Sequence, residues 1–286
     1  MTTLTHSLPH FYRLARMDKP IGSLLLLWPT LWALWFASNG VPALYLLFAF
    51  IVGVFLMRSA GCVFNDLADR NFDGHVERTR ERPLVTGAVT PRQAIVFALI
   101  LCLLAACLLV PMNQLTWLLA LPALWLAASY PLTKRFFPLP QAYLGIAFGF
   151  GIPMGYAAVL GRIPADGWVM LAANIFWALA YDTEYAMVDR NDDIHLGIHS
   201  SALTFGRFDV VAVMCCYALT LLLLTCAGWM AQRGGFWFAG LIGAAMIAAY
   251  HYTLIRGRER KDCFRAFMHN NWFGACIFAG VVLDTL

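Results

Sequence analysis

Charged side chains are scarce in this sequence. Only 13% of its 286 residues are Asp, Glu, Lys or Arg, and 61% are hydrophobic, whereas about 25% charged and about 45–50% apolar residues are usual in soluble proteins. A soluble domain of this length could bury many apolar side chains, but its surface would still need more charge. The composition therefore excludes an ordinary soluble protein and predicts that much apolar surface faces lipid.

Charge is absent altogether from several long runs. No charged residue occurs in the 38 positions between Lys19 and Arg58 or in the 41 positions between Arg92 and Lys134. Each run is long enough for two spanning helices of about 20 residues with a turn near its middle. Five further apolar segments cover residues 136–161, 167–181, 210–232, 234–255 and 266–283. The sequence thus predicts an all-α integral membrane protein with nine transmembrane helices around a central cavity.

Two further features are missing. No small-residue cleavage site follows the basic start of the chain, so the first apolar segment is expected to be a permanent span rather than a signal peptide. The eight cysteines show no C-x-x-C spacing, and most of them lie within predicted spans. They are interpreted as small apolar packing residues rather than metal ligands or disulfides.

Basic residues are divided very unevenly between the two predicted faces. Of 20 Lys and Arg residues, 18 fall on one face, and only Arg162 and Arg233 fall on the other. The positive-inside rule therefore places the N-terminus in the cytoplasm and the C-terminus outside a cell inner membrane. Topology explains the basic residues, including the group Arg256–Arg265, so the net charge of +4 does not indicate nucleic-acid binding.

Acidic residues should be rare on the basic face, yet ten of the sixteen lie there in the two segments 66–81 and 182–193. In the first, Asn65, Asp69 and Asp73 recur every four residues, so they share one face if the helix continues past the membrane. Carboxylates stacked one turn apart repel each other unless a cation lies between them. The first segment therefore predicts a metal-binding face.

The second acidic segment repeats the spacing at Asp189 and Asp193. The apolar pattern of this helix continues past Asp182 and Glu184, and Tyr181 and Tyr185 lie on the motif face one to two turns deeper. Oxygen ligands without His or Cys favour Mg²⁺, whose coordination is commonly completed by substrate phosphates. Further candidate ligands, or partners of ligands, are Asp66, Asp182 and Asp192.

A diphosphate is therefore the expected ligand. The alternative is that both segments are solvated acidic loops, but the matching spacing on one membrane face and the cost of burying carboxylates near a membrane disfavour it.

Arg58 lies seven residues before Asn65, and so about two turns deeper on the same face. An unpaired guanidinium there would be expensive, so a substrate anion is expected beside it.

The chain resembles a known family, the intramembrane aromatic prenyltransferases, and within it the branch that prenylates 4-hydroxybenzoate in ubiquinone synthesis. The motifs that carry the resemblance are NDLADRNFD at 65–73, YDTEYAMVDRNDD at 181–193, RMDKPIGSLLLLWPTLWAL at 16–34, ERTRERPLVTGAV at 77–89 and YPLTKRFFPLPQ at 130–141. It implies one transmembrane domain over residues 1–286, with cytoplasmic motif loops at about 58–92 and 182–208. The chain departs from the family at Glu184, where Gln is more usual, and at His195 and His199, where Lys is expected.

The resemblance also implies a mechanism. Mg²⁺ held by the two motifs would bind polyprenyl diphosphate. The ring carbon of 4-hydroxybenzoate ortho to the hydroxyl group would attack the allylic cation left by the departing diphosphate. Residues that look like diphosphate partners are Arg78, Arg82, Lys134 and Arg135. Arg58 and Arg16 would hold the acceptor's carboxylate, and Tyr130 and Tyr185 would stabilise the cation. The expected site opens to the cytoplasm, and no obligate protein partner is expected.

Three alternatives stay open at this stage. The aspartate motifs alone mark a superfamily that also prenylates naphthoates, haem and other acceptors. Internal symmetry suggests two four-helix repeats followed by one more helix, although the identity between the halves is faint. A divalent-cation transporter is the rival of a different class, but its path should carry ionisable groups at mid-membrane or on both faces. The predicted outer connections hold only Arg162, Asp166, Arg233 and Asp284.

Overall fold

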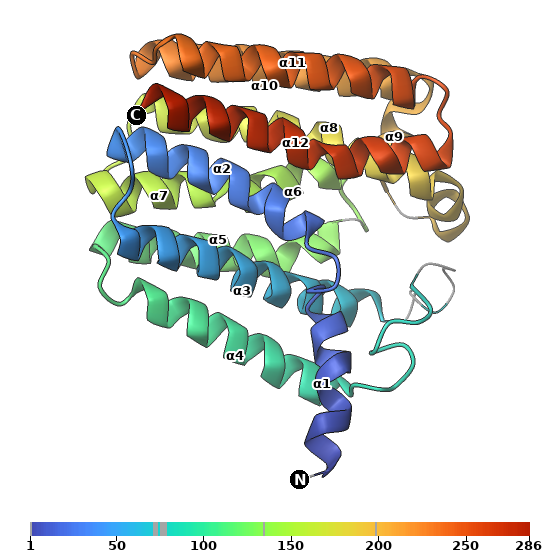
Figure 1. Cartoon of the computed structure of the whole chain (residues 1–286). Coiled ribbons are helices and arrows are strands. Elements are labelled where there is room, and N and C mark those ends of the chain that lie inside the picture. The colour runs from blue at the N-terminus through green and yellow to red at the C-terminus, as the bar shows by residue number, and fades with distance from the viewer. Residues whose placement is uncertain (1, 71–73, 75–78, 134, 198) are drawn as a thin grey trace.

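The computed structural model describes residues 2–70, 74, 79–133, 135–197 and 199–286. Most of this chain is helical, and the long helices lie side by side across Figure 1. The helices are α1 (Thr2–Leu14), α2 (Ile21–Ser38), α3 (Leu44–Asp69), α4 (Pro91–Leu109), α5 (Gln114–Thr133), α6 (Pro140–Gly149), α7 (Gly151–Leu160), α8 (Ala165–Leu196), α9 (Ser201–Phe205), α10 (Asp209–Met230), α11 (Gly235–Ile255) and α12 (Arg260–Asp284), with a 3₁₀ turn at Gly206–Phe208.

Eight segments of the described chain are long and apolar enough to cross a membrane, which makes this a multi-span membrane protein. They are α2, α3, α4, α5, the α6–α7 pair, the segment Ser201–Met230, α11 and α12. The ninth predicted span corresponds to α8, which is 32 residues long but carries Asn174, Asp182 and Glu184 in its interior and is not among the eight. The count of nine and the orientation of the termini stay predictions.

Both motif-bearing helices extend past the apolar runs. α3 is helical to Asp69 and α8 is helical to Leu196, so Asn65, Asp69, Asp189 and Asp193 lie on helices and not in loops. The C-terminal ends of α3 and α8 lie at the same end of the bundle (Figure 1). The two motifs therefore stand at one face of the molecule.

The predicted span over 136–161 is broken in its middle. α6 ends at Gly149 and α7 begins at Gly151, with Pro153 in the first turn of α7. Proline has no N–H to donate to the preceding turn, which favours a break there. α6 also approaches α8 closely, because a Cβ atom on Gly145 would lie only 2.9 Å from the Cα atom of Ile175.

The main core lies between α2, α8, α10, α11 and α12 and contains the fully buried Trp32, Trp177, Trp237 and Phe273. α2 and α12, from opposite ends of the chain, pack directly on each other (Figure 1). The indole Nε1 of Trp28 donates to Asn271 Oδ1 at 3.0 Å, and that of Trp32 donates to the Gly274 carbonyl at 3.1 Å. This junction closes the bundle.

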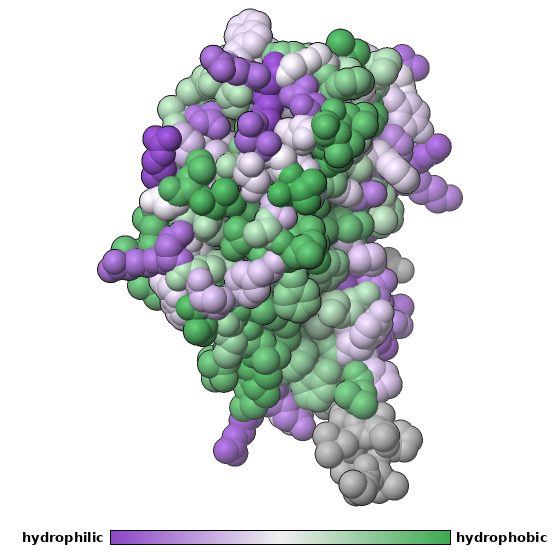
Figure 2. Space-filling model, turned by 60° about the vertical axis from the view of Figure 1, so that its left-hand side comes forward, coloured by the Kyte–Doolittle hydropathy of each residue, from purple (hydrophilic) through white to green (hydrophobic). Residues whose placement is uncertain are grey.

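α4 and α5 are much less covered by the rest of the protein. Their exposed side chains include Leu99, Leu103, Leu118 and Leu121. Figure 2 shows apolar side chains over much of the lower half of one face, at the height of α3, α4 and α5 in Figure 1. This surface suits contact with lipid tails.

The amino-terminal helix α1 was not expected from the sequence. Its last residue Leu14 is fully buried in a small second cluster with Val63, Val89, Ala94 and Ala98. α1 therefore docks on α3 and the start of α4 and does not add a span.

Candidate active site

One large cavity opens between the helices. Its volume is about 910 Å³, and its wall is formed by side chains of α2 to α8 and α12. Its polar residues include Arg16, Lys19, Asn65, Asp66 and Arg82, close to the C-terminal end of α3. Most of the remaining wall is apolar.

Many residues that the sequence singled out line this cavity. Those in its wall are Arg16, Arg58, Asn65, Asp66, Arg82, Tyr130, Asp182 and Tyr185. They come from α3, α5, α8 and the connections that precede α2 and α4. The structure thus brings residues of both motif helices to one cavity.

Other predicted residues are described by the structure but do not line the cavity. Those not in its wall are Asp69, Arg135, Asp189, Asp192 and Asp193. Arg135 reaches the first motif, because its Nη2 donates to the Ala68 carbonyl at 3.0 Å. Asp69 interacts electrostatically with Tyr130. Asp73, Arg78 and Lys134 lie outside the described residues.

Asp66 binds two arginines of the cavity wall. Arg16 Nη2 donates to its two carboxylate oxygens at 3.0 and 3.2 Å, and Arg82 Nη1 lies 3.0 Å from Oδ1. Asp66 is only 1% exposed. Because charge-assisted hydrogen bonds of this kind are strong and directional, the carboxylate fixes two guanidinium groups at the mouth of the cavity.

Arg58 lies deeper, between α2 and α6. Its guanidinium stands 5.4 Å from the centre of the Phe148 ring, and Nη1 donates to Cys62 Sγ at 2.6 Å. A Cβ on Gly22 would lie 2.5 Å from Nη2, so the glycine leaves the space that Arg58 occupies. Its buried Nε finds no hydrogen-bond partner within the described part of the chain. Arg58 therefore retains a donor for a ligand.

The end of α8 is held by basic residues that the sequence analysis assigned to membrane topology alone. Arg260 Nη2 lies 3.9 Å from Asp189 Oδ1 and 3.6 Å from Asp192 Oδ2. Nearby, Arg190 and Arg258 both bind the fully buried Asp209, at 2.8 and 2.6 Å. These hydrogen bonds raise the pKa of Arg258 above its usual value. The spacing of the motifs gave no signal for these partners, which come from α10, from the connection between α11 and α12 and from the start of α12.

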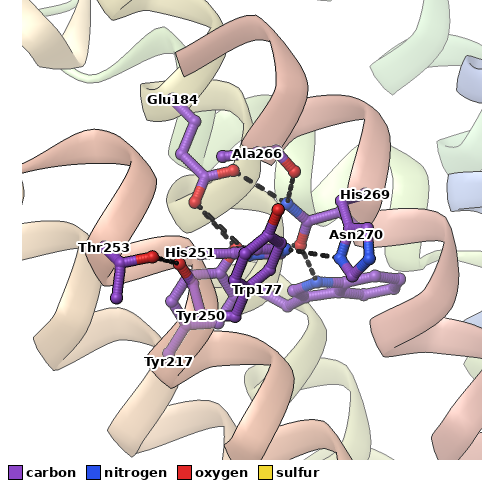
Figure 3. A network of polar contacts seen from close by, with 9 residues as sticks. All are labelled: Trp177, Glu184, Tyr217, Tyr250, His251, Thr253, Ala266, His269 and Asn270. Atoms are coloured by element: carbon purple, nitrogen blue, oxygen red, sulfur yellow. Dashed lines mark hydrogen bonds and ion pairs between the residues drawn. The ribbon is translucent and has the colours of Figure 1, made fainter. Parts of the chain in front are cut away.

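Glu184 is the centre of a buried polar network behind the cavity (Figure 3). Tyr217 donates to Glu184 Oε1 at 2.9 Å, and Asn270 Nδ2 donates to Oε2 at 2.8 Å. Asn270 Oδ1 in turn accepts from Trp177 Nε1 at 2.9 Å. The Tyr217 hydroxyl lies 2.9 Å from His251 Nδ1. The acidic residue expected inside this helix is therefore satisfied by α10, α11 and α12 and does not face the cavity.

The donors available to a metal ion are mainly amide and carboxylate oxygens. Among the residues that the structure describes, no three His, Cys, Asp or Glu side chains are grouped closely enough to form a metal site by themselves. Asn65 and Asp182 nevertheless line the same cavity from α3 and α8. Such a set fits a hard cation that shares its coordination with water and a phosphate ligand.

Sequence comparison gives consistent matches over nearly the whole chain. A family model described as the UbiA prenyltransferase family matches residues 26–273. A 4-hydroxybenzoate octaprenyltransferase from Azoarcus sp. is 65% identical over 284 residues, which are 99% of this chain and 99% of that protein. A protein of the same name from Methylobacillus flagellatus is 62% identical over 280 residues, covering 98% of this chain and 95% of that one.

The fold has solved neighbours. The apo structure of a UbiA homolog from Aeropyrum pernix superposes with a TM-score of 0.81 and 25% identity, covering 95% of this chain and 99% of that one. A UbiA homolog from Archaeoglobus fulgidus bound to GPP and Mg²⁺ superposes with a TM-score of 0.70 and 19% identity, over 96% and 99% of the two chains.

Proposed function

This chain belongs to the UbiA prenyltransferase family, and we propose that it transfers a polyprenyl group from polyprenyl diphosphate to 4-hydroxybenzoate. It is a membrane prenyltransferase, so the transporter alternative is discarded. The products would be 3-polyprenyl-4-hydroxybenzoate and diphosphate. The single observation that carries the choice of acceptor is the 65% identity, over 99% of both chains, to a relative with that name.

Mg²⁺ is the metal that the donor set suits. Asn65 and Asp69 of α3 would hold it together with Asp73, which lies outside the described residues, and Asp189 and Asp193 would hold it from α8. Asp182 lines the cavity about two turns deeper on α8. When bound, Mg²⁺ would offset the negative charge that develops on the departing diphosphate. The homolog from Archaeoglobus fulgidus bound to GPP and Mg²⁺ supports this assignment.

The protein's own cations would complete the diphosphate site. Arg82 is fixed by Asp66 at the mouth of the cavity, and Arg135 reaches the end of α3. Arg78 and Lys134 are predicted to join them. As the bond between the allylic carbon and the bridging oxygen breaks, these groups would hold the departing diphosphate in place.

The acceptor would lie below the diphosphate. Arg58 would bind its carboxylate, and the ring carbon ortho to the hydroxyl would attack the allylic carbon. The ring carbon would then lose its proton, which restores the aromatic ring. Tyr130 and Tyr185 line the cavity, where the negative faces of their rings would stabilise the allylic cation. The apolar tail of the donor would follow the wall formed by α4 and α5 toward the lipid.

The proposed orientation has nine spans, a cytoplasmic N-terminus and an active site that opens to the cytoplasm. Its support is the uneven charge distribution, with 18 of the 20 basic residues on one face. An inner-membrane location fits this distribution.

The test uses membranes that contain the full chain. They are incubated with Mg²⁺, octaprenyl diphosphate and radiolabelled 4-hydroxybenzoate, and label is measured in the lipid extract. Transfer of label to a lipid-soluble product is expected. If no donor length gives transfer to 4-hydroxybenzoate, while a naphthoate or another phenol is prenylated, the proposed acceptor is wrong.

A further inference from the structure

The hydroxyl group of Tyr181 is buried in the cavity wall and has no partner there. Tyr181 is 1% exposed and lines the cavity from α8. Its oxygen forms no hydrogen bond to any part of the chain that the structure describes. Leaving a buried hydroxyl unsatisfied costs about 1–3 kcal/mol, so native proteins seldom retain one without a reason.

The aromatic ring of Tyr181 is held in place by its neighbours. The ring of Trp177 lies nearly perpendicular to it, at a centroid distance of 5.3 Å and an interplanar angle of 84°, and the ring of Phe267 lies 6.3 Å away. Trp177 is itself fixed by its hydrogen bond to Asn270. A ring held on two sides cannot turn its hydroxyl freely toward another protein group, so the missing partner is expected to come from a ligand.

The depth of Tyr181 indicates which ligand this is. It lies eight residues before Asp189 on α8, and Arg58 lies eleven residues before Asp69 on α3. At about 1.5 Å per residue, the two side chains start about 12 and 16 Å below their aspartates. Tyr181 also interacts electrostatically with Asp182 and, less strongly, with Arg58. Both donors therefore lie on the side of the cavity away from the proposed diphosphate site.

The shape of 4-hydroxybenzoate decides which of its ends reaches this depth. The carbon that is prenylated is next to the hydroxyl group, so the hydroxyl end must lie toward the diphosphate. The carboxylate stands opposite on the ring and points away from the reacting bond, toward Arg58 and Tyr181. Its oxygens can accept several hydrogen bonds at once.

We propose that the Tyr181 hydroxyl donates a hydrogen bond to the acceptor's carboxylate beside Arg58, so that α8 and α3 hold this group together. The inference rests on the proposed function and adds a neutral donor, the Tyr181 hydroxyl, to the cationic donor Arg58. Two donors on different helices fix the direction of the ring as well as its position, which sets the carbon that meets the allylic end of the donor.

The decisive variant is Tyr181→Phe in the full-length enzyme. The KM for 4-hydroxybenzoate should rise about tenfold or more, as expected for a lost hydrogen bond to a charged group. The KM for the polyprenyl diphosphate should not change. The control is Tyr156→Phe, because that hydroxyl binds Asp166 at 2.5 Å and does not line the cavity. It should leave both KM values unchanged. An unchanged KM for 4-hydroxybenzoate in Tyr181→Phe overturns the proposal.

Two inhibitors identify which end of the acceptor is bound. Benzoate has the carboxylate without the hydroxyl, and phenol has the reverse. Tyr181→Phe should weaken inhibition by benzoate by the same factor as the KM rises and leave inhibition by phenol unchanged. Weaker inhibition by phenol alone would show that Tyr181 binds the phenolic group, which contradicts the carboxylate assignment.

Melting temperatures separate binding from folding. Without substrates, Tyr181→Phe should melt at the temperature of the wild type or above it, because its hydroxyl has no partner in the described protein. Stabilisation by added benzoate should be lost. A lower melting temperature without ligand would assign the hydroxyl to the fold and refute the proposal. Failure of the wild type to prenylate 4-hydroxybenzoate would instead refute the proposed function.

Discussion

Neighbouring residues of the first motif have different surroundings. Asn65 and Asp66 both line the cavity, but the carboxylate of Asp66 is already bound by Arg16 and Arg82. Asp66 thus orients two guanidinium groups toward the cavity mouth. Asp69 and Asp189 lie on the two helices that face each other across the cavity and are the carboxylates on which the proposed metal site depends.

Replacing either of these aspartates should abolish turnover. Asp69→Ala and Asp189→Ala each remove an oxygen donor from one half of the site, and the loss of transition-state stabilisation corresponds to about a thousandfold or more in rate. Initial rates with labelled 4-hydroxybenzoate at saturating Mg²⁺ measure this. Asp262→Ala, which removes a carboxylate outside the cavity wall, should retain activity. Ordinary rates in either motif variant would rule out a site shared by α3 and α8.

The sequence predicted several residues that the structure places in the cavity wall, but it did not predict the side chains that hold the motif helices in place. Asn65 and Asp182 were predictable because a polar group at helical spacing beside an apolar run has few structural explanations. The partners of Glu184 were not, because Tyr217 and Asn270 lie 33 and 86 residues away and only folding brings them together. The same holds for Arg260. The positive-inside rule alone accounts for this residue in the sequence, and only the structure shows its contact with Asp189 of the second motif.

The helix α8 contributes both to the cavity wall and to the buried polar network. One side carries Tyr181, Asp182 and Tyr185 to the cavity, and the other carries Glu184 into the network shared with α10, α11 and α12 (Figure 3). Because the Glu184 carboxylate accepts hydrogen bonds from Tyr217 and Asn270, it fixes the rotation of α8 about its own axis and the position of α8 along that axis. The positions of Tyr181, Asp182 and Tyr185 in the cavity wall thus depend on hydrogen bonds made on the opposite side of α8.

Removal of the Glu184 side chain should destabilise the protein. Glu184→Ala leaves the buried donors of Tyr217 and Asn270 without this acceptor, at a cost of about 3 kcal/mol in the free energy of unfolding. Glu184→Gln should lose much less, because an amide can accept from Asn270 and donate to the Tyr217 oxygen. Unfolding in mixed micelles gives both values, with the exposed Glu259→Ala as control. Equal losses for Ala and Gln would show that the negative charge is required.

The breaks in the helices were only partly predictable. The apolar runs located the eight spanning segments because a spanning helix must be both long and free of charge. The break between α6 and α7 was missed, although Gly149, Gly151 and Pro153 lie around it. α1 was missed because it contains Pro9 and is too short for a span, and because Leu14 is buried only through tertiary contact.

For the molecule as a whole, the cavity combines a polar mouth with apolar walls. The mouth is formed by Arg16, Asp66 and Arg82, and the walls reach α4 and α5, whose outer faces suit lipid. A charged diphosphate and an apolar chain can therefore be bound together without exposing the chain to water. This arrangement requires the mouth to lie on the side where both substrates are available.

Fusion reporters test the proposed orientation. A reporter after Leu286 should be active on the outer side of the membrane, and one inserted within residues 76–90 should be active in the cytoplasm, because 18 of the 20 basic residues fall on the face of that connection. A fusion within residues 161–164, before α8, is predicted to share the compartment of Leu286. The same compartment for Leu286 and 76–90 would exclude nine spans.

The contact between α2 and α12 has a consequence for how the protein is made. Trp28 and Trp32 are synthesised long before Asn271 and Gly274. Their two indole N–H groups therefore lack these acceptors until α12 has been made. Until α12 arrives, the wall that Phe264 and Phe267 give to the cavity is also absent. The α2–α12 contact can therefore form only after α12 is synthesised, and we expect a nascent chain to be inactive until α12 is inserted.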